Sequence, residues 1–217
     1  MLLWLLGCAY KGIPMPGTPR HLSGYVQKMA TSKEPSQPQL TPDNIQKSTS
    51  LGELVAQSAI NMKGESTLIV EEQSYRFDCS GFVLAAHAQS KLVLEGNTRS
   101  LFEQSKSLNT LSTESPLPGD VVFFNNTYDR NNNGKLDDEL THIAIVVTVE
   151  EDGTVSMIHL GGSGVTSLTM NVQHPDDHRS PQGTIWNGYL RVNKAGEDSP
   201  RLAGQLFLSY GRLWTPH

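Results

Sequence analysis

The spacing of apolar residues divides the chain into a helical part followed by a strand-rich part. Apolar residues recur at helical spacing in three segments, which predicts helices over residues 50–62, 79–91 and 99–107. After Pro116 the pattern changes to short apolar runs, which predict strands over residues 120–124, 142–149, 154–160, 184–192 and 205–209. Helices first and an antiparallel sheet second indicate an α+β domain over residues 50–217.

Residues 1–49 differ from this domain in composition. Residues 9–49 are rich in Pro, Ser, Thr and Gln, which predicts a flexible tether. Residues 1–8 end in Leu-Leu-Gly-Cys, which resembles a bacterial lipobox, although no Lys or Arg precedes Cys8. We therefore expect lipidation of Cys8 and a periplasmic lipoprotein anchored in the outer membrane. The alternative is an apolar N-terminus with an incidental cysteine.

The composition narrows the classes of function. The chain of 217 residues has a net charge of −5 and no long basic run, which argues against nucleic-acid binding. Its two cysteines, Cys8 and Cys79, are too few for a disulfide scaffold. No apolar run approaches the ~20 residues of a membrane-spanning helix.

The sequence Asp-Cys-Ser-Gly at residues 78–81 places Cys79 where a loop becomes a helix. The N-terminal end of a helix carries partial positive charge, so we expect Cys79 to be a thiolate nucleophile. His142 opens an apolar strand and is the candidate base, and His159 lies in the next strand. The competing interpretation of Cys79 is a buried structural cysteine. His87 lies ~12 Å further along the helix of Cys79 and is excluded as its base.

The two histidines belong to a predicted hairpin whose turn is Glu-Glu-Asp-Gly at residues 150–153. A loop of even length places His142 and His159 on one face of the sheet, whereas an odd length places them on opposite faces. The face of His142 also carries Ala144 and Val146, which are small enough for the helix of Cys79 to pack closely there. The other face carries isoleucines and valines, which predicts that it packs in the hydrophobic core.

Four motifs occur in order: Phe-Asp-Cys-Ser-Gly-Phe-Val, Pro-Gly-Asp-Val-Val-Phe-Phe, His-Ile-Ala-Ile-Val and Ile-His. Over residues 50–162 the chain thus resembles the NlpC family of papain-like cell-wall cysteine peptidases. The resemblance implies a papain-like α+β fold, with helices packed on a central antiparallel sheet and the catalytic cysteine at a helix N-terminus. It implies that Cys79 is the nucleophile, His142 the general base and His159 the residue that orients the base.

The same resemblance implies cleavage of peptide bonds in peptidoglycan stem peptides, often between D-glutamate and a diamino acid, without a cofactor. One departure lies at residues 65–74, where the family usually has an aromatic-Trp-Gly-Gly stretch that shapes the substrate cleft. The substrate specificity is therefore open. Two other hypotheses remain: an amidase or acyltransferase that uses the same residues on another acyl substrate, and a non-catalytic, calcium-responsive wall-binding lipoprotein. The reactivity of the Cys79 thiol distinguishes the enzymes from the binding protein.

A second departure is an insertion at residues 129–139, which matches much of a calcium-binding loop. Leu140 occupies the twelfth position, where such loops carry a bidentate glutamate, and Asp138 or Glu139 is the possible substitute. The alternative is an ordinary polar turn. The expected calcium ligands are Asp129, Asn131, Asn133, the carbonyl of Lys135, and Asp137, with Gly134 at the sharp turn.

Overall fold

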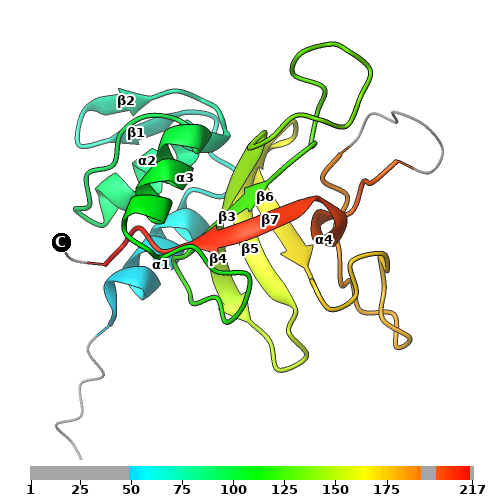
Figure 1. The fold of residues 1–217 in the computed structure, drawn as a ribbon. Coiled ribbons are helices and arrows are strands. Elements are labelled where there is room, and N and C mark those ends of the chain that lie inside the picture. The colour runs from blue at the N-terminus through cyan, green and yellow to red at the C-terminus, as the bar shows by residue number, and fades with distance from the viewer. Residues whose placement is uncertain (1–48, 192–198, 216–217) are drawn as a thin grey trace, which may run out of the picture. The chain divides into compact units, whose positions relative to one another are not determined.

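A computed structural model describes residues 49–191 and 199–215 of the chain. The expected α+β architecture is confirmed, with helices packed against a five-stranded antiparallel sheet (Figure 1). The helices are α1 (Leu51–Asn61), α2 (Cys79–Gln89), α3 (Thr98–Ser107) and α4 (Ala203–Leu206). The sheet has the order β6-β5-β4-β3-β7, and its strands are β3 (Val121–Phe124), β4 (His142–Val149), β5 (Val155–Gly161), β6 (Gly164–Met170) and β7 (Phe207–Gly211).

The three predicted helices are confirmed. Each of them directly follows a residue whose side chain caps it. The Ser50 hydroxyl accepts a hydrogen bond from the Glu53 amide, and the Glu53 carboxylate accepts one from the Ser50 amide. Asp78 caps α2, and Asn97 caps α3 through the amides of Arg99 and Ser100. The caps place the helix starts within a residue of those expected from the sequence.

The prediction of strands is right in part. The strand predicted at residues 184–192 is wrong, because the backbone there forms loop contacts and isolated bridges instead of a ladder. The buried Asn187 side chain joins this segment to residues outside it, because it donates to the carbonyls of His174 and Asp177. The strand predicted at residues 205–209 lies at residues 207–211 instead, because residues 205 and 206 belong to α4. The sequence analysis missed α4, β6 and a separate hairpin of β1 (Leu68–Val70) and β2 (Gln73–Tyr75).

A β-bulge determines on which face of the sheet the two histidines lie. Next to the turn, Val149 pairs with Val155, a register that would put His142 and His159 on opposite faces. The register shifts between Val146 and Thr148, so that Val146 pairs with Met157. The one-residue shift brings His142 and His159 onto the same face of the sheet.

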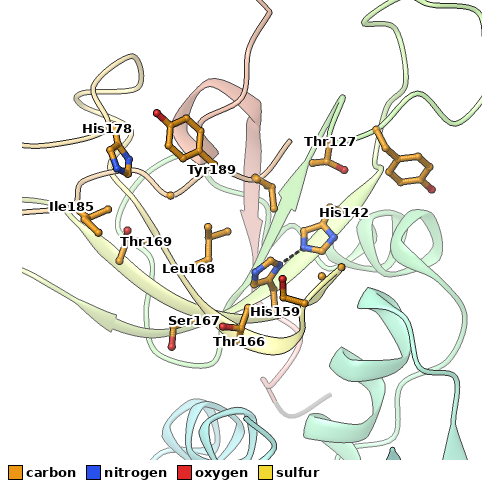
Figure 2. A pocket seen from close by; sticks show the side chains of 16 residues that line it. Thr127, His142, His159, Thr166, Ser167, Leu168, Thr169, His178, Ile185 and Tyr189 are labelled. Carbon is orange, nitrogen blue, oxygen red and sulfur yellow. Dashed lines mark hydrogen bonds between the residues drawn. The ribbon is translucent and has the colours of Figure 1, made fainter. Parts of the chain in front are cut away.

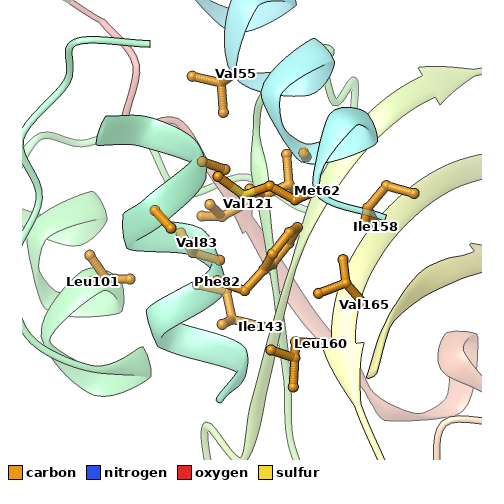
Figure 3. Close-up of a cluster of buried hydrophobic side chains, with 14 of the residues drawn as sticks. Val55, Met62, Phe82, Val83, Leu101, Val121, Ile143, Ile158, Leu160 and Val165 are labelled. Atoms are coloured by element: carbon orange, nitrogen blue, oxygen red, sulfur yellow. The ribbon is translucent and has the colours of Figure 1, made fainter. Parts of the chain in front are cut away.

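The face of the sheet that α2 covers is the opposite of the one expected. Phe82 and Val83 of α2 pack among the residues around Ile143 (Figure 3). Ala144 and Val146 belong to a second apolar cluster with α4. The larger isoleucine side chains bury more apolar area against a helix than alanine does. The helix of Cys79 and the imidazole of His142 therefore lie on different faces of β4.

Asp120 clamps the C-terminal segment to the start of β3. Its carboxylate is buried and accepts two hydrogen bonds from the Arg212 guanidinium, at 2.9 and 3.0 Å. It also accepts from the Trp214 indole at 2.9 Å and from the Leu117 amide at 2.9 Å. The acidic residue of the Pro-Gly-Asp motif thus has a structural role.

Cys8 and the proposed tether lie outside the described residues. Within residues 49–191 and 199–215, the helices are all too short or too polar to cross a membrane.

Candidate active site

Cys79 is the first residue of α2, and its neighbours in the Asp-Cys-Ser-Gly motif build the start of that helix. One oxygen of Asp78 accepts from the Gly81 amide at 2.7 Å and from the Ser80 hydroxyl at 2.9 Å. The Cys79 amide is among the first helical N–H groups, which have no carbonyl partner within the helix. This amide is thereby available to a ligand beside the thiol.

Gly81 lets the preceding loop fold back over the first turn of α2. A Cβ atom at Gly81 would lie 2.0 Å from the carbonyl oxygen of Arg76, closer than any side chain allows. The Arg76 guanidinium donates to the Ser80 hydroxyl at 3.2 Å and lies 3.2 Å from the Asp78 carboxylate. The residues around Cys79 therefore serve to hold it in position at the start of α2.

The Cys79 thiol lies at the entry of β4. It is 3.9 Å from the Thr98 hydroxyl and receives a backbone hydrogen bond from Ile143, the residue after His142. Burial raises the pKa of the Cys79 thiol, and the hydrogen bonds from Thr98, Ile143 and Ser80 do not offset this effect. The expectation of a resting thiolate at the helix N-terminus is therefore wrong, because burial in this site favours the neutral thiol.

The two histidines form a hydrogen-bonded pair. His142 Nε2 lies 2.8 Å from His159 Nδ1, and the rings are nearly perpendicular (Figure 2). Burial lowers the pKa of His142 to about 3 and that of His159 to about 4, so both rings are neutral near pH 7. When His142 donates from Nε2, its Nδ1 carries a lone pair and is the basic atom.

A gap between two strands brings the thiol and the histidines to one end of the sheet. Registered pairing of β4 with β5 runs only from Ile145 to Val149, so the strands are unpaired where β4 begins at His142. Cys79 lies at this opening, beside the Ile143 backbone. Gly161 leaves room for the His159 ring, since a Cβ there would lie 2.9 Å from ring atom Cε1.

Cys79 and the histidines line two neighbouring pockets. Cys79 lines a pocket of about 310 Å³, and His142 and His159 line a pocket of about 610 Å³. Tyr128 borders both pockets, which makes it a shared wall. Among the described residues, no hydrogen bond joins Cys79 to His142; the side chain that forms a hydrogen bond with the thiol is that of Thr98.

The profile of the NlpC/P60 family matches residues 62–190, more than half of the chain. The chain belongs to the NlpC/P60 family. Members of this family are generally cysteine peptidases or hydrolases of the cell wall. The family match supports this coarse role and leaves the substrate open.

Two solved structures of NlpC/P60 proteins are similar to the chain. NlpC2 from Trichomonas vaginalis is 18% identical with a TM-score of 0.42, and the alignment covers 77% of this chain and 48% of that one. A Staphylococcus aureus protein described as similar to lipoprotein, NLP/P60 family, is 19% identical with a TM-score of 0.35, covering 75% of this chain and 41% of that one. The chain thus spans less than half the length of either protein. The curated proteins include no match.

Sequence analysis missed several residues of this NlpC/P60 site. Thr98, beside the thiol, is the first residue of α3, one position before the predicted helix. Tyr128 directly precedes the insertion and carries no pattern of its own. His178 and Tyr189 lie at the far end of the larger pocket (Figure 2), and Tyr189 belongs to the segment that was wrongly predicted to be a strand. Only the location of Tyr128 between two motifs offered a clue.

The insertion of this NlpC/P60 domain folds around its own side chains. The Asp129 carboxylate accepts from the amides of Asn133 and Gly134, and the Asn133 side chain donates to Asp137 at 3.0 and 3.1 Å. Hydrogen bonds from Asn133 and Asn131 lower the pKa of Asp137. Two carboxylates thus converge on one asparagine, as ligands of a cation would, and calcium binding stays a prediction.

Asp138 and Glu139, the possible substitutes for the missing twelfth ligand, interact with other residues instead. Asp138 is buried and accepts a hydrogen bond from the Arg130 amide at 2.9 Å. Glu139 lies 3.9 Å from the Arg99 guanidinium. Within the described ranges, no group of three or more His, Cys, Asp or Glu residues is arranged to hold a metal ion.

Proposed function

We propose that the chain is a cell-wall cysteine hydrolase that cleaves an amide bond in peptidoglycan stem peptides through Cys79, His142 and His159. The observation that carries the proposal is the hydrogen bond between the two histidines; in the tautomer in which His142 donates this bond, its Nδ1 is the basic atom. The thiol at the start of α2 lies beside the residue that follows this base. The site needs no cofactor for this chemistry.

The reaction follows from these positions. His142 Nδ1 takes the proton of the Cys79 thiol as the sulfur attacks the amide carbonyl, because neither group is charged at rest. The free Cys79 amide stabilises the oxyanion that forms. His142 then gives its proton to the leaving amine, and a water molecule, deprotonated by His142, releases the acid from the thioester.

Cys79→Ser tests the nucleophile, since a hydroxyl is far harder to deprotonate than a thiol. The purified variant is incubated with peptidoglycan fragments, and the products are weighed by mass spectrometry. Cys8→Ser is the matched control, because it removes the chain's other cysteine. We expect loss of cleavage only in Cys79→Ser, and undiminished cleavage by this variant would end the proposal.

His159→Asn and His159→Leu test the orienting role. An amide oxygen still accepts the His142 ring proton, whereas a leucine does not. We expect the Asn variant to retain appreciable activity and the Leu variant to lose far more. Equal activity in both variants and the parent would remove His159 from the site.

We further propose that Cys8 is lipidated and anchors the domain to the periplasmic side of the outer membrane, with peptidoglycan as the neighbouring substrate. The lipobox-like sequence at residues 5–8 supports this location. Fractionation of cells tests it: the parent should be found in the membrane fraction and Cys8→Ser in the soluble periplasmic fraction. A soluble parent that retains residues 1–7 would contradict the anchor.

A further inference from the structure

Thr98 belongs to the buried face of α3. It shares this face with Leu101 and Ser105, at helical spacing. Thr98 is 7% exposed, and Leu101 packs in the apolar cluster around Phe82 (Figure 3). Buried positions of this kind are usually filled by apolar residues such as valine, which has nearly the shape of threonine. A hydroxyl at this position needs a hydrogen-bond partner, because burying it without one costs free energy.

The partner of this hydroxyl is the candidate nucleophile. Thr98 Oγ1 lies 3.9 Å from Cys79 Sγ and, among the described residues, forms a hydrogen bond with no other group. Both residues line the pocket of about 310 Å³. The distance is longer than that of a hydrogen bond between two oxygen atoms, and hydrogen bonds of a catalytic site often tighten only during the reaction. The hydroxyl is thus poised beside the reacting atom.

The first turn of α3 holds Thr98 in this position. The side chain of the preceding residue, Asn97, accepts hydrogen bonds from the amides of Arg99 and Ser100, at 3.0 and 3.1 Å. Gly96 lets the chain enter the helix closely, since a Cβ there would lie 2.6 Å from the Ser100 side chain. The helix therefore starts at a defined residue, and the hydroxyl of that residue faces the thiol.

The charged side chains of the pocket are poorly placed to stabilise a negative charge on the sulfur. They are those of Asp78, Arg99 and Arg130. Asp78 disfavours the anion through its own charge. Arg99 lies 3.9 Å from the Glu139 carboxylate, and Arg130 lies 3.8 Å from that of Asp138. The stabilisation of the anion is therefore left to uncharged donors.

His142 is neutral near pH 7, so charge develops on the sulfur only as His142 takes the proton. A thiolate can only accept hydrogen bonds, and a hydroxyl beside it must therefore donate. We propose that Thr98 is a further catalytic residue, whose hydroxyl donates to the Cys79 sulfur and stabilises the charge that develops there during the attack. Donation by Thr98 also leaves the S–H hydrogen free for transfer to the base. This inference rests on the proposed function and adds a residue to its site.

Thr98→Val tests the donor, because it removes the hydroxyl and nearly keeps the shape of the side chain. Labelling by iodoacetamide follows the ionised fraction of the thiol and requires no hydrolysis. Loss of a hydrogen bond to a charged group should slow labelling of Cys79 by about tenfold at each pH between 6 and 8. The kcat/KM for peptidoglycan fragments should fall by a similar factor. Thr98→Ser keeps the hydroxyl and should stay close to the parent in both measurements.

Thr154→Val is the matched control. Thr154 is also buried, at 5% exposure, and its hydroxyl accepts a hydrogen bond from the Asn171 side chain at 3.1 Å. It lies at the turn between β4 and β5, next to the pair of Val149 and Val155. Labelling of Cys79 should be unchanged in this variant. Thr98→Ala replaces Thr98→Val if thermal melting shows that the latter is unfolded.

The outcomes separate this inference from the proposed function. A folded Thr98→Val or Thr98→Ala variant that is labelled at the parent's rate would overturn the role of Thr98. An equal loss in Thr98→Ser or in Thr154→Val would also overturn it, because the effect would then be structural. Neither result would affect the hydrolase, which the Cys79→Ser variant tests. A parent chain that cleaves no peptidoglycan fragment would overturn the proposed function, and labelling would still decide whether Thr98 donates to the sulfur.

Discussion

Alkylation of Cys79 should accelerate steeply as the pH is raised from 6 to 8. Iodoacetamide reacts with the thiolate, so its rate follows the ionised fraction of the thiol. An ordinary thiol is ionised to only a few per cent at pH 7, and burial raises the pKa of Cys79 above the ordinary value. In that regime the ionised fraction, and with it the rate, rises about tenfold per pH unit. A hundredfold increase, roughly, is expected over this range.

His142 should contribute little to this profile. Burial holds the pKa of His142 at about 3, so the ring carries no positive charge with which to stabilise a thiolate at pH 6–8. His142→Ala is therefore expected to abolish hydrolysis while leaving the pH dependence of alkylation nearly unchanged. A thiolate–imidazolium pair would behave differently, because removal of the imidazolium would shift the whole curve to higher pH.

The measurement is the rate of labelling under excess iodoacetamide. Mass spectrometry of the peptide that contains Cys79 separates its modification from that of Cys8. The urea-unfolded chain in the same buffers is the control, and its exposed Cys79 should react faster at each pH because burial no longer opposes ionisation. A labelling rate in the folded chain that is flat between pH 6 and 8 would refute the reasoning and restore the resting thiolate.

Four other perturbations have defined outcomes. Gly81→Ala should abolish hydrolysis and lower the melting temperature, since its Cβ would meet the Arg76 carbonyl at 2.0 Å; normal activity would show that the loop adapts. Asp120→Ala should reduce the free energy of unfolding, measured by urea denaturation, by about 3 kcal/mol, because it leaves Arg212 without its buried partner; a loss below about 1 kcal/mol would contradict the clamp. His87 has its pKa lowered to about 4 by burial, so its share of the loss of stability between pH 6.5 and 4 should be about 3 kcal/mol, in addition to the shares of His142 and His159; His87→Leu should remove that share, and an unchanged slope would contradict the assignment. Calcium at millimolar concentration should raise the melting temperature of the parent and not of Asp129→Ala, whereas calorimetry without binding would reduce residues 129–139 to a polar turn.

The helices were predictable from the sequence because their signals are local. Ser50 with Glu53 is a capping box, and Asp78 precedes Cys79 by the one position that an N-cap requires. In α1 and α3 the apolar residues also recur at helical spacing. Local chemistry of this kind needs no knowledge of distant contacts.

The strands that escaped prediction lack such a signal. Along β6 the buried positions include Val165 and Leu168, which point to opposite faces, so strict alternation is absent. The predicted strand at residues 184–192 has suitable residue types, but the contacts of the Asn187 side chain with segments distant in sequence determine its structure. Tertiary contacts overrode the local preference there.

The sequence indicated the three candidate catalytic residues but neither the other residues around them nor their geometry. The motifs indicated Cys79, His142 and His159, but the face shared by the histidines depends on a bulge between Val146 and Thr148. Burial of the thiol depends on how closely α2 approaches β4. This distance cannot be predicted from the sequence pattern. The direction of the Cys79 pKa was therefore predicted incorrectly from the helix end alone.

The position of β7 at one edge of the sheet has a consequence for biosynthesis. β3 lies between β4 and β7, and all four of its residues are buried. While the ribosome has not yet released residues 207–214, β3 has an open apolar edge, and Asp120 has neither Arg212 nor Trp214 as a partner. Open edges of this kind template pairing with other chains. The sheet should therefore be completed only after residues 207–214 have left the ribosome, and the nascent chain should depend on chaperones to keep β3 from pairing with other chains until then.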